Sequence, residues 1–122
     1  MGYAAIQTML LSYKLEKSNK EFELMQITNK LTEEASKSRQ LADAVIDAKS
    51  EVSEDDPDYV ETLEAINDEY NLELAEIAEM EDELDRKKRS CETQIGYLDG
   101  YIETWTAALQ QDVAKSHTYG AQ

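Results

Sequence analysis

Apolar residues recur at alternating steps of three and four over most of this sequence, and that spacing constrains the fold more than any other feature. Such a spacing keeps one face of a helix apolar and favours left-handed supercoiling of paired helices. Two series with this spacing can be traced, one on each side of the only proline, Pro57. The pattern therefore predicts two long helices that pair along their apolar faces.

The two series differ in how regular they are. The first is interrupted by two pairs of polar residues and consists of Tyr3, Ile6, Leu10, Tyr13, Lys17, Lys20, Leu24, Ile27, Leu31, Glu34, Ser38, Leu41, Val45, Ala48 and Val52. The second keeps its spacing throughout and consists of Val60, Leu63, Asn67, Tyr70, Leu74, Ile77, Glu81, Leu84, Lys88, Cys91, Ile95, Leu98, Ile102, Trp105, Leu109, Asp112, Ser116 and Tyr119. We expect both sets to face inward.

The segment between the series, SEVSEDDPD at 50–58, is suited to a reversal of the chain. Proline disrupts a helix interior but fits its first position, and Asp56 stands before Pro57 as a candidate N-cap. We therefore predict a turn at Asp55, Asp56, Pro57 and Asp58. The fold class that follows is all-α, a long antiparallel two-helix hairpin or coiled coil. The whole chain, 1–122, is expected to form this single hairpin, with a first helix at about 3–52, a turn at about 53–57 and a second helix at about 58–118.

A turn at this place predicts that residues whose numbers sum to about 111 lie opposite one another. Lys20 should then lie near Cys91, and Ile6 near Trp105. The basic run Arg86–Arg89 should lie beside acids of the first helix, including Glu21 and Glu23, and neutralise them.

Charge is distributed unevenly along the chain. Sixteen of the 27 acidic residues lie between Lys49 and Arg86, a stretch without lysine or arginine, and the net charge is −15. Because phosphate binding needs a basic surface, we expect no nucleic-acid partner. No apolar run is long enough for a membrane span, and no secretory signal is visible at the N-terminus.

The sequence offers little for catalysis or metal binding. It contains one histidine, His117, and one cysteine, Cys91, so we expect neither an intrachain disulfide nor a zinc site. The acids around Pro57 lack the alternating spacing and the glycine of a calcium loop. A di-iron bundle would need histidines at helical spacing, which are absent. We therefore expect no enzyme activity, no catalytic residue, no metal site and no cofactor.

Additional apolar residues occur outside the two series near the chain ends: Met9, Leu11, Leu15, Phe22, Met25, Tyr97, Tyr101 and Ala108. A helix that is apolar on more than one face is usually covered on more than one side. Since a two-helix pair encloses little core, we expect other copies of the chain to provide the cover. The predicted self-assembly interface consists of Ala4, Ala5, Met9, Leu15, Phe22, Gly96, Tyr97, Gly100, Tyr101, Trp105 and Ala108.

Gly96 and Gly100 lie inside the second predicted helix, where each glycine costs about 1 kcal/mol relative to alanine. One interpretation is that they allow another helix to approach closely, as small residues do in membrane helix pairs. The aromatic neighbours Tyr97, Tyr101 and Trp105 favour this interpretation. The alternative is that the glycines form a flexible joint or kink.

Two resemblances to known families can be stated. The opening M-G-Y-A-A-I-Q-T-M-L-L, with Lys17, Glu21 and Phe22, resembles small uncharacterised bacterial helical proteins that begin M-G-L-A-A-S-Q-A-R and carry a later K-x-x-x-E-[FY]. The hairpin resembles subunits of type III secretion needles and the core helices of flagellar filaments, although it has only Pro57 in place of P-x-x-P. The second resemblance implies leaderless export and assembly through the terminal helices.

Two functions from different classes follow from these observations. The first is a structural subunit that assembles with itself into a filament or tube, with the terminal segments in the core and the acidic turn outside. Its location would then be extracellular or at the cell surface. The alternative is a cytoplasmic coiled-coil adaptor or export chaperone, similar to the stalk protein of flagellar export, whose acidic arm covers a basic client protein.

Overall fold

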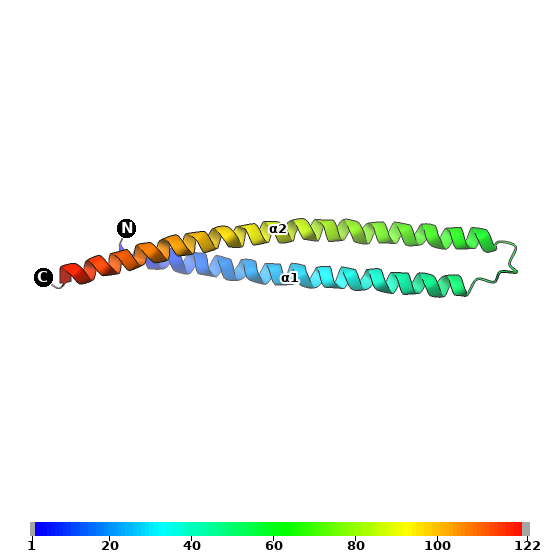
Figure 1. Cartoon of the computed structure of the whole chain (residues 1–122), viewed down its shortest axis with the longest axis horizontal. Helices are drawn as coiled ribbons and strands as arrows, with labels where there is room; N and C mark the ends of the chain where they lie inside the picture. The colour runs from blue at the N-terminus through cyan, green and yellow to red at the C-terminus, as the bar shows by residue number, and fades with distance from the viewer. Residues whose placement is uncertain (1, 121–122) are drawn as a thin grey trace. The chain divides into compact units, whose positions relative to one another are not determined.

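In the computed structural model of the protein, the backbone is described for residues 2–120 and the side-chain surroundings for residues 2–115. Two helices make up the fold: α1, Tyr3–Ser50, and α2, Tyr59–Gly120. They lie side by side and run in opposite directions (Figure 1). No strand occurs among the described residues. The predicted fold class, an all-α antiparallel helical hairpin, is confirmed.

The ends of α1 agree with local sequence. The helix follows Gly2, whose carbonyl oxygen accepts from the amide of Ile6 at 3.1 Å. At the other end, the hydroxyl of Ser50 donates to the carbonyl of Asp47 at 2.7 Å, and Lys49 lies in the last turn. A cation there interacts favourably with the helix dipole. The observed end at Ser50 is two residues before the predicted one.

Residues 51–58 connect the two helices, and Asp56 accepts two hydrogen bonds near the end of this connection. Its carboxylate accepts from the amide of Asp58 at 2.9 Å, while its carbonyl oxygen accepts from the amide of Tyr59 at 3.1 Å. This is the arrangement of a side chain that caps the first turn of a helix, with Pro57 at the position where a missing amide hydrogen costs nothing. The connection therefore leads directly into α2.

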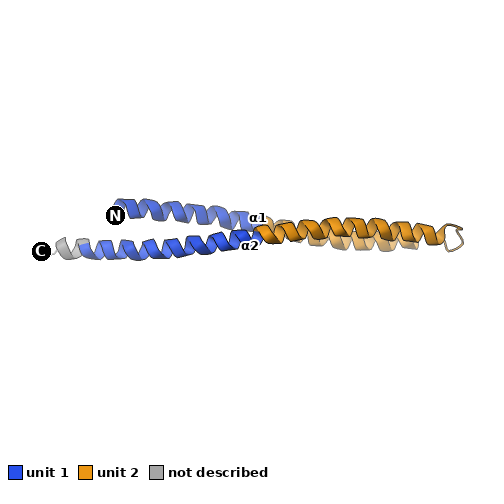
Figure 2. Ribbon diagram, turned by 90° about the horizontal axis from the view of Figure 1, so that it is seen from above, with its two compact units in different colours: residues 1–26, 88–122 blue, residues 27–87 orange. Residues whose placement is uncertain are grey.

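The hairpin divides into two compact units (Figure 2). Unit 1 comprises residues 1–26 and 88–122, and unit 2 comprises residues 27–87. Each unit is a pair of antiparallel helical segments, one from α1 and one from α2. Unit 1 contains both chain ends, and unit 2 contains the connection.

Few side chains are buried in either unit. The buried apolar residues of unit 1 are Ile6, Leu10, Cys91 and Leu98, and those of unit 2 are Ile27 and Leu84. All six belong to the two series of the sequence. The thiol of Cys91 donates to the carbonyl oxygen of Lys20 at 3.0 Å, which confirms that these two residues lie opposite one another.

The predicted register is wrong in the first two turns of α2. Val60 and Asn67, which the second series placed inward, are exposed, whereas Tyr59 and Ile66 are partly buried. The inward residues follow the spacing Tyr59, Leu63, Ile66 and Tyr70 instead. This series has the same alternation of four and three but no polar member. Ser116 and Tyr119, at the other end of the series, lie outside the residues whose side chains are described.

Candidate interaction surface

An apolar stripe on α1 faces away from α2 within unit 1. Leu11, Leu15, Phe22 and Met25 are 52% to 70% exposed, and with Ser18 they follow steps of four, three, four and three. Residues at this spacing share one helix face. The inward positions of the same segment, such as Leu10 and Leu24, lie on the other side. We call Leu11, Leu15, Ser18, Phe22 and Met25 the outer stripe.

Tyrosines provide the exposed apolar surface of α2 in the same unit. Tyr97 is 64% exposed and Tyr101 is 50% exposed. The ring of Tyr101 packs against that of Tyr13, with centroids 5.4 Å apart and planes tilted by 33°. Tyr97, Leu98 and Tyr101 border an open groove of about 380 Å³. Tyr101 therefore contacts α1 with one side of its ring and leaves the remainder exposed.

Gly96 and Gly100 are exposed on α2, and no neighbouring part of the chain occupies the space where a side chain would begin. A Cβ atom built at either position has no atom within 4 Å, and neither glycine has a positive φ. The helix runs through both without interruption. Neither a close contact with α1 nor an unusual backbone conformation therefore requires a glycine at either position.

The other residues of the predicted interface fall into two groups. Ala4 and Ala5 are exposed, and Met9 is partly buried. Trp105 and Ala108 are also partly buried, because they lie beside Ile6 at an open groove of about 260 Å³ between the helices. Trp105 thus contributes mainly to packing within the hairpin.

Among the residues whose side chains are described, one ion pair joins the helices of unit 1. The ammonium nitrogen of Lys17 lies 2.6 Å from Oδ1 of Asp99 and 3.7 Å from Oε1 of Glu21. The hydrogen bond to Asp99, followed by the charge of that carboxylate, raises the pKa of Lys17 above its ordinary value. Lys17 interrupts the first apolar series, and the pair explains how a lysine occupies an inward position there. Its long stem also covers apolar surface.

Cys91 is a packing residue. It is 3% exposed, and burial raises the pKa of its thiol, with a smaller contribution from the charge of Glu23. A thiol in this state has little of the thiolate that nucleophilic chemistry and metal binding require. Among the described residues, no group of three or more histidine, cysteine, aspartate or glutamate side chains is arranged to hold a metal ion.

We expect the Cys91 thiol to react with a disulfide reagent at pH 8 at least about tenfold more slowly in the folded protein than in urea, because it is buried and protonated. The raised pKa also implies a pH effect. At pH below the ordinary thiol pKa both states are protonated and stability is unaffected; at higher pH the unfolded thiol ionises first, so the free energy of unfolding falls. Absorbance kinetics and urea titrations from pH 7 to 10, with Cys91→Ala as the control, measure both effects. Equal rates in the two states would contradict the assignment.

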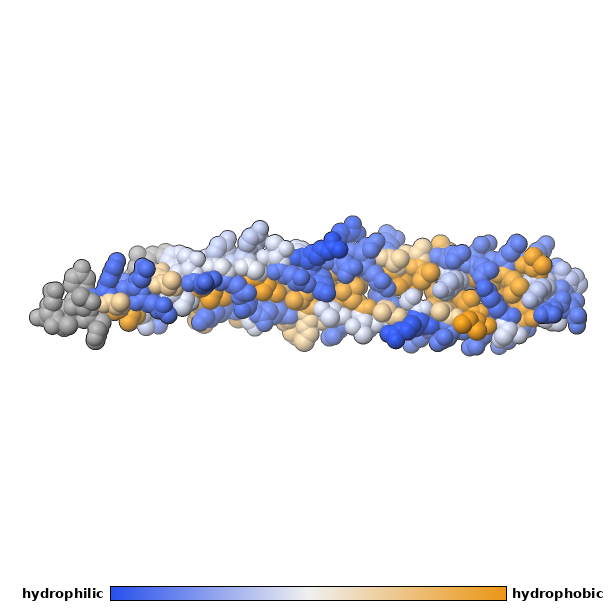
Figure 3. Space-filling view, in the orientation of Figure 1, coloured by the Kyte–Doolittle hydropathy of each residue, from blue (hydrophilic) through white to orange (hydrophobic). Residues whose placement is uncertain are grey.

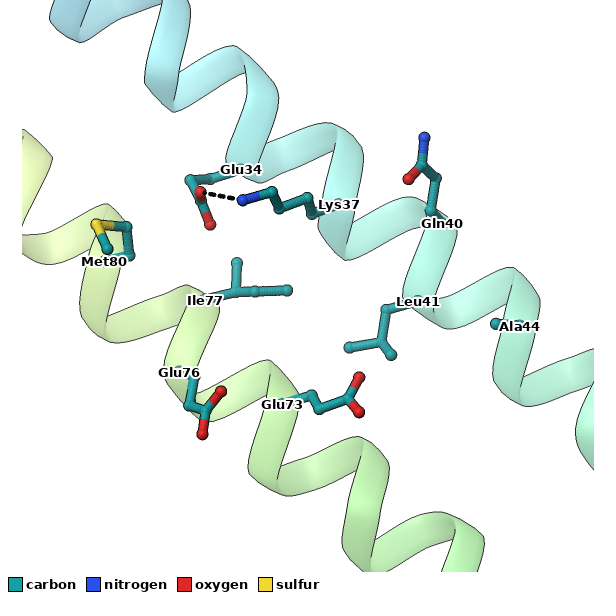
Figure 4. A pocket seen from close by; sticks show the side chains of 9 residues that line it. All are labelled: Glu34, Lys37, Gln40, Leu41, Ala44, Glu73, Glu76, Ile77 and Met80. Carbon is teal, nitrogen blue, oxygen red and sulfur yellow. Dashed lines mark hydrogen bonds and ion pairs between the residues drawn. The ribbon is translucent and has the colours of Figure 1, made fainter.

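In unit 2, an open groove of about 630 Å³ lies between the helices (Figure 4). Leu41, Ala44, Ile77 and Met80 provide its apolar lining. The carboxylate of Glu34 accepts from the ammonium of Lys37 at 3.0 Å, and the Glu34 side chain is only 12% exposed. Glu34 therefore occupies an inward position that an apolar residue would normally hold.

Among the described residues, the basic run forms no ion pair with the acids of α1. Among the ion pairs of the described residues, its only member is Lys87, which lies 3.4 Å from Glu83 one turn earlier in α2. Glu23, which was expected beside the basic run, pairs with Lys20 at 3.1 Å in its own helix. Pairs three or four residues apart in one helix form without any contact to the other helix.

The geometry defines the class of this protein as an antiparallel helical hairpin with an apolar surface on the outside of unit 1. Apolar residues also reach the surface among hydrophilic ones on the face shown in Figure 3. Neither described helix contains a segment apolar enough to cross a membrane. Comparison of the chain with protein-family models, curated proteins and solved structures found no match.

Proposed function

We propose that the chain is a structural subunit that associates with copies of itself through the apolar surface of unit 1 and polymerises into a filament or tube. The observation that carries the proposal is the row of exposed large apolar side chains that shares one face of α1 in unit 1. The buried apolar residues of this unit are Ile6, Leu10, Cys91 and Leu98. The exposed large apolar residues of unit 1 include the four apolar members of the outer stripe, together with Tyr97 and Tyr101.

Exposed apolar side chains gathered on one part of a molecule favour association, because covering them removes apolar area from water. The stripe on α1 and the tyrosines on α2 offer two separate surfaces per copy. A subunit with two separate contact surfaces continues to add neighbours instead of stopping at a closed pair. The resemblance to needle and filament subunits agrees with this proposal and would place assembly at the cell surface.

Unit 2 would remain in water in such an assembly. The stretch between Lys49 and Arg86 carries sixteen acids, and copies brought close together there would repel one another within a screening length of about 8 to 10 Å. Association through unit 1 therefore avoids this repulsion.

We expect Leu15→Lys to weaken self-association at least about tenfold, because it introduces a charge into the outer stripe. Ile46→Lys is the matched control, since Ile46 is 65% exposed against 62% for Leu15 but belongs to unit 2. Sedimentation velocity over a hundredfold range of concentration, with negative-stain microscopy of the same samples, measures the effect. A wild-type chain that stays monomeric throughout would contradict the proposal, as would equal effects of the two substitutions.

The acidic stretch supports a second candidate, an adaptor or export chaperone that binds a basic client protein. Among the described ion pairs of unit 2, only Glu34 and Glu83 have basic partners. Binding to a basic protein would then weaken strongly as salt is added. The wild-type chain by itself would form only short particles that do not grow. Titration with a lysine-rich peptide at two salt concentrations distinguishes this function from self-assembly.

A further inference from the structure

The outer stripe is flanked by charges of opposite sign on one edge. Lys14 directly precedes Leu15, and Glu21 directly precedes Phe22, so both charges lie on the same side of the stripe, two turns apart. Lys14 forms no ion pair in the part of the chain that the structure describes. Among the ion pairs that the structure describes, Glu21 takes part in one, at 3.7 Å from Lys17, whose shorter ion pair is to Asp99. Both charges are therefore available to a partner.

The spacing of the stripe allows it to pack against the same stripe on α1 of a second copy of the chain. If two stripes pack antiparallel, with facing numbers that sum to 33, Leu11 faces Phe22 of the partner subunit and Leu15 faces Ser18 of the partner subunit. In an antiparallel pair, residues on the same edge of each stripe meet across the contact. Lys14 then lies nearly level with Glu21 of the partner subunit, and the two-fold axis repeats the pair.

We propose that two copies of this chain pack the outer stripes of α1 against one another, antiparallel and around a two-fold axis, with Lys14 of each paired to Glu21 of the other. This inference rests on the proposed self-association and specifies its first contact. The opposite edge of the stripe carries the uncharged residues Ser12 and Asn19, which meet without repulsion. Such a two-fold contact is the commonest kind in homo-oligomers.

The charges select the direction of packing. In a parallel pair, residues on opposite edges would meet, so Lys14 would face Asn19 of the partner subunit and Glu21 would face Gln26 of the partner subunit. A parallel pair gains no ion pair, whereas the antiparallel pair gains two. The contact also leaves the outward side of α2, with Gly96 and Gly100, free for a second contact, which a growing filament requires.

Charge reversal tests this register. Lys14→Glu places two acids opposite one another in the homodimer, and Glu21→Lys places two lysines there, so each variant alone should associate about tenfold more weakly than wild type at low salt. An equimolar mixture of the two variants restores both attractive pairs and should associate as tightly as wild type. The double variant, K14E/E21K, should do the same. Sedimentation equilibrium at 20 mM and 500 mM salt measures these affinities, and the differences should shrink at high salt.

The mixture controls for changes within each helix, because every chain in it is also present in the single-variant samples. Lys30→Glu controls for net charge, since it makes the same change of charge as Lys14→Glu at an exposed site of unit 2, and it should leave the affinity unchanged. If wild type associates but the mixture is no tighter than the single variants, the proposed contact is wrong while self-association stands. If wild type does not associate at all, both proposals fail.

Discussion

Leu84→Ala should lower the free energy of unfolding by about 2 to 4 kcal/mol, within the range of about 2 to 5 kcal/mol observed when a buried leucine is truncated. Leu84 is 4% exposed and, with Ile27, forms the small buried part of unit 2. A two-helix pair has no second layer to collapse into the space that is left. Because the hairpin holds few such residues, the loss should be a large fraction of its total stability. The thermal midpoint should fall by roughly 8 to 15 °C.

Leu72→Ala is the matched control, because it makes the same change on the same helix and in the same unit. Leu72 is 65% exposed, so its truncation should change the free energy of unfolding by no more than about 0.5 kcal/mol. Urea unfolding followed by circular dichroism, at one fixed protein concentration, measures both variants without a contribution from changed association. Equal losses for Leu84 and Leu72 would mean that the inward face of α2 has been assigned wrongly.

Glu34→Leu should raise the free energy of unfolding by about 1 to 2 kcal/mol. The Glu34 side chain is only 12% exposed at the groove that Leu41 and Ile77 also line, and its partner Lys37 is itself 61% exposed (Figure 4). An exposed lysine compensates little for the lost hydration of a carboxylate. A leucine at this place covers apolar surface of the groove instead, and a fully buried leucine contributes about 1.5 to 3 kcal/mol. The open groove reduces that gain.

Glu33→Leu provides the comparison, since Glu33 is the preceding residue and is exposed. Its replacement should leave the stability within about 0.5 kcal/mol of wild type. Thermal and urea unfolding of both variants measure the difference. A loss of stability in Glu34→Leu would show that the ion pair with Lys37 stabilises this part of the hairpin more than apolar packing does.

Part of the candidate surface could be predicted from residue spacing alone. Leu15, Phe22, Tyr97 and Tyr101 fall outside the inward series, and all four are at least half exposed. Trp105 is different, because it belongs to the inward series and is partly buried beside Ile6. A large ring at an inward position is covered by the facing helix, whereas the same ring one position later would remain in solvent.

The sequence by itself determined that there are two helices, where the chain reverses and which residues lie opposite one another. Those properties depend on short-range features: the 3.5-residue spacing, Pro57 with its capping Asp56, and the fixed rise per residue that brings Lys20 to Cys91. The tertiary structure decided which face of α2 points toward α1 in its first two turns. The series through Val60 and Asn67 and the series through Tyr59 and Ile66 share Leu63 and Tyr70, so spacing permits both. Packing against α1 selected the second, because it turns the polar Asn67 to water and Ile66 toward the facing helix.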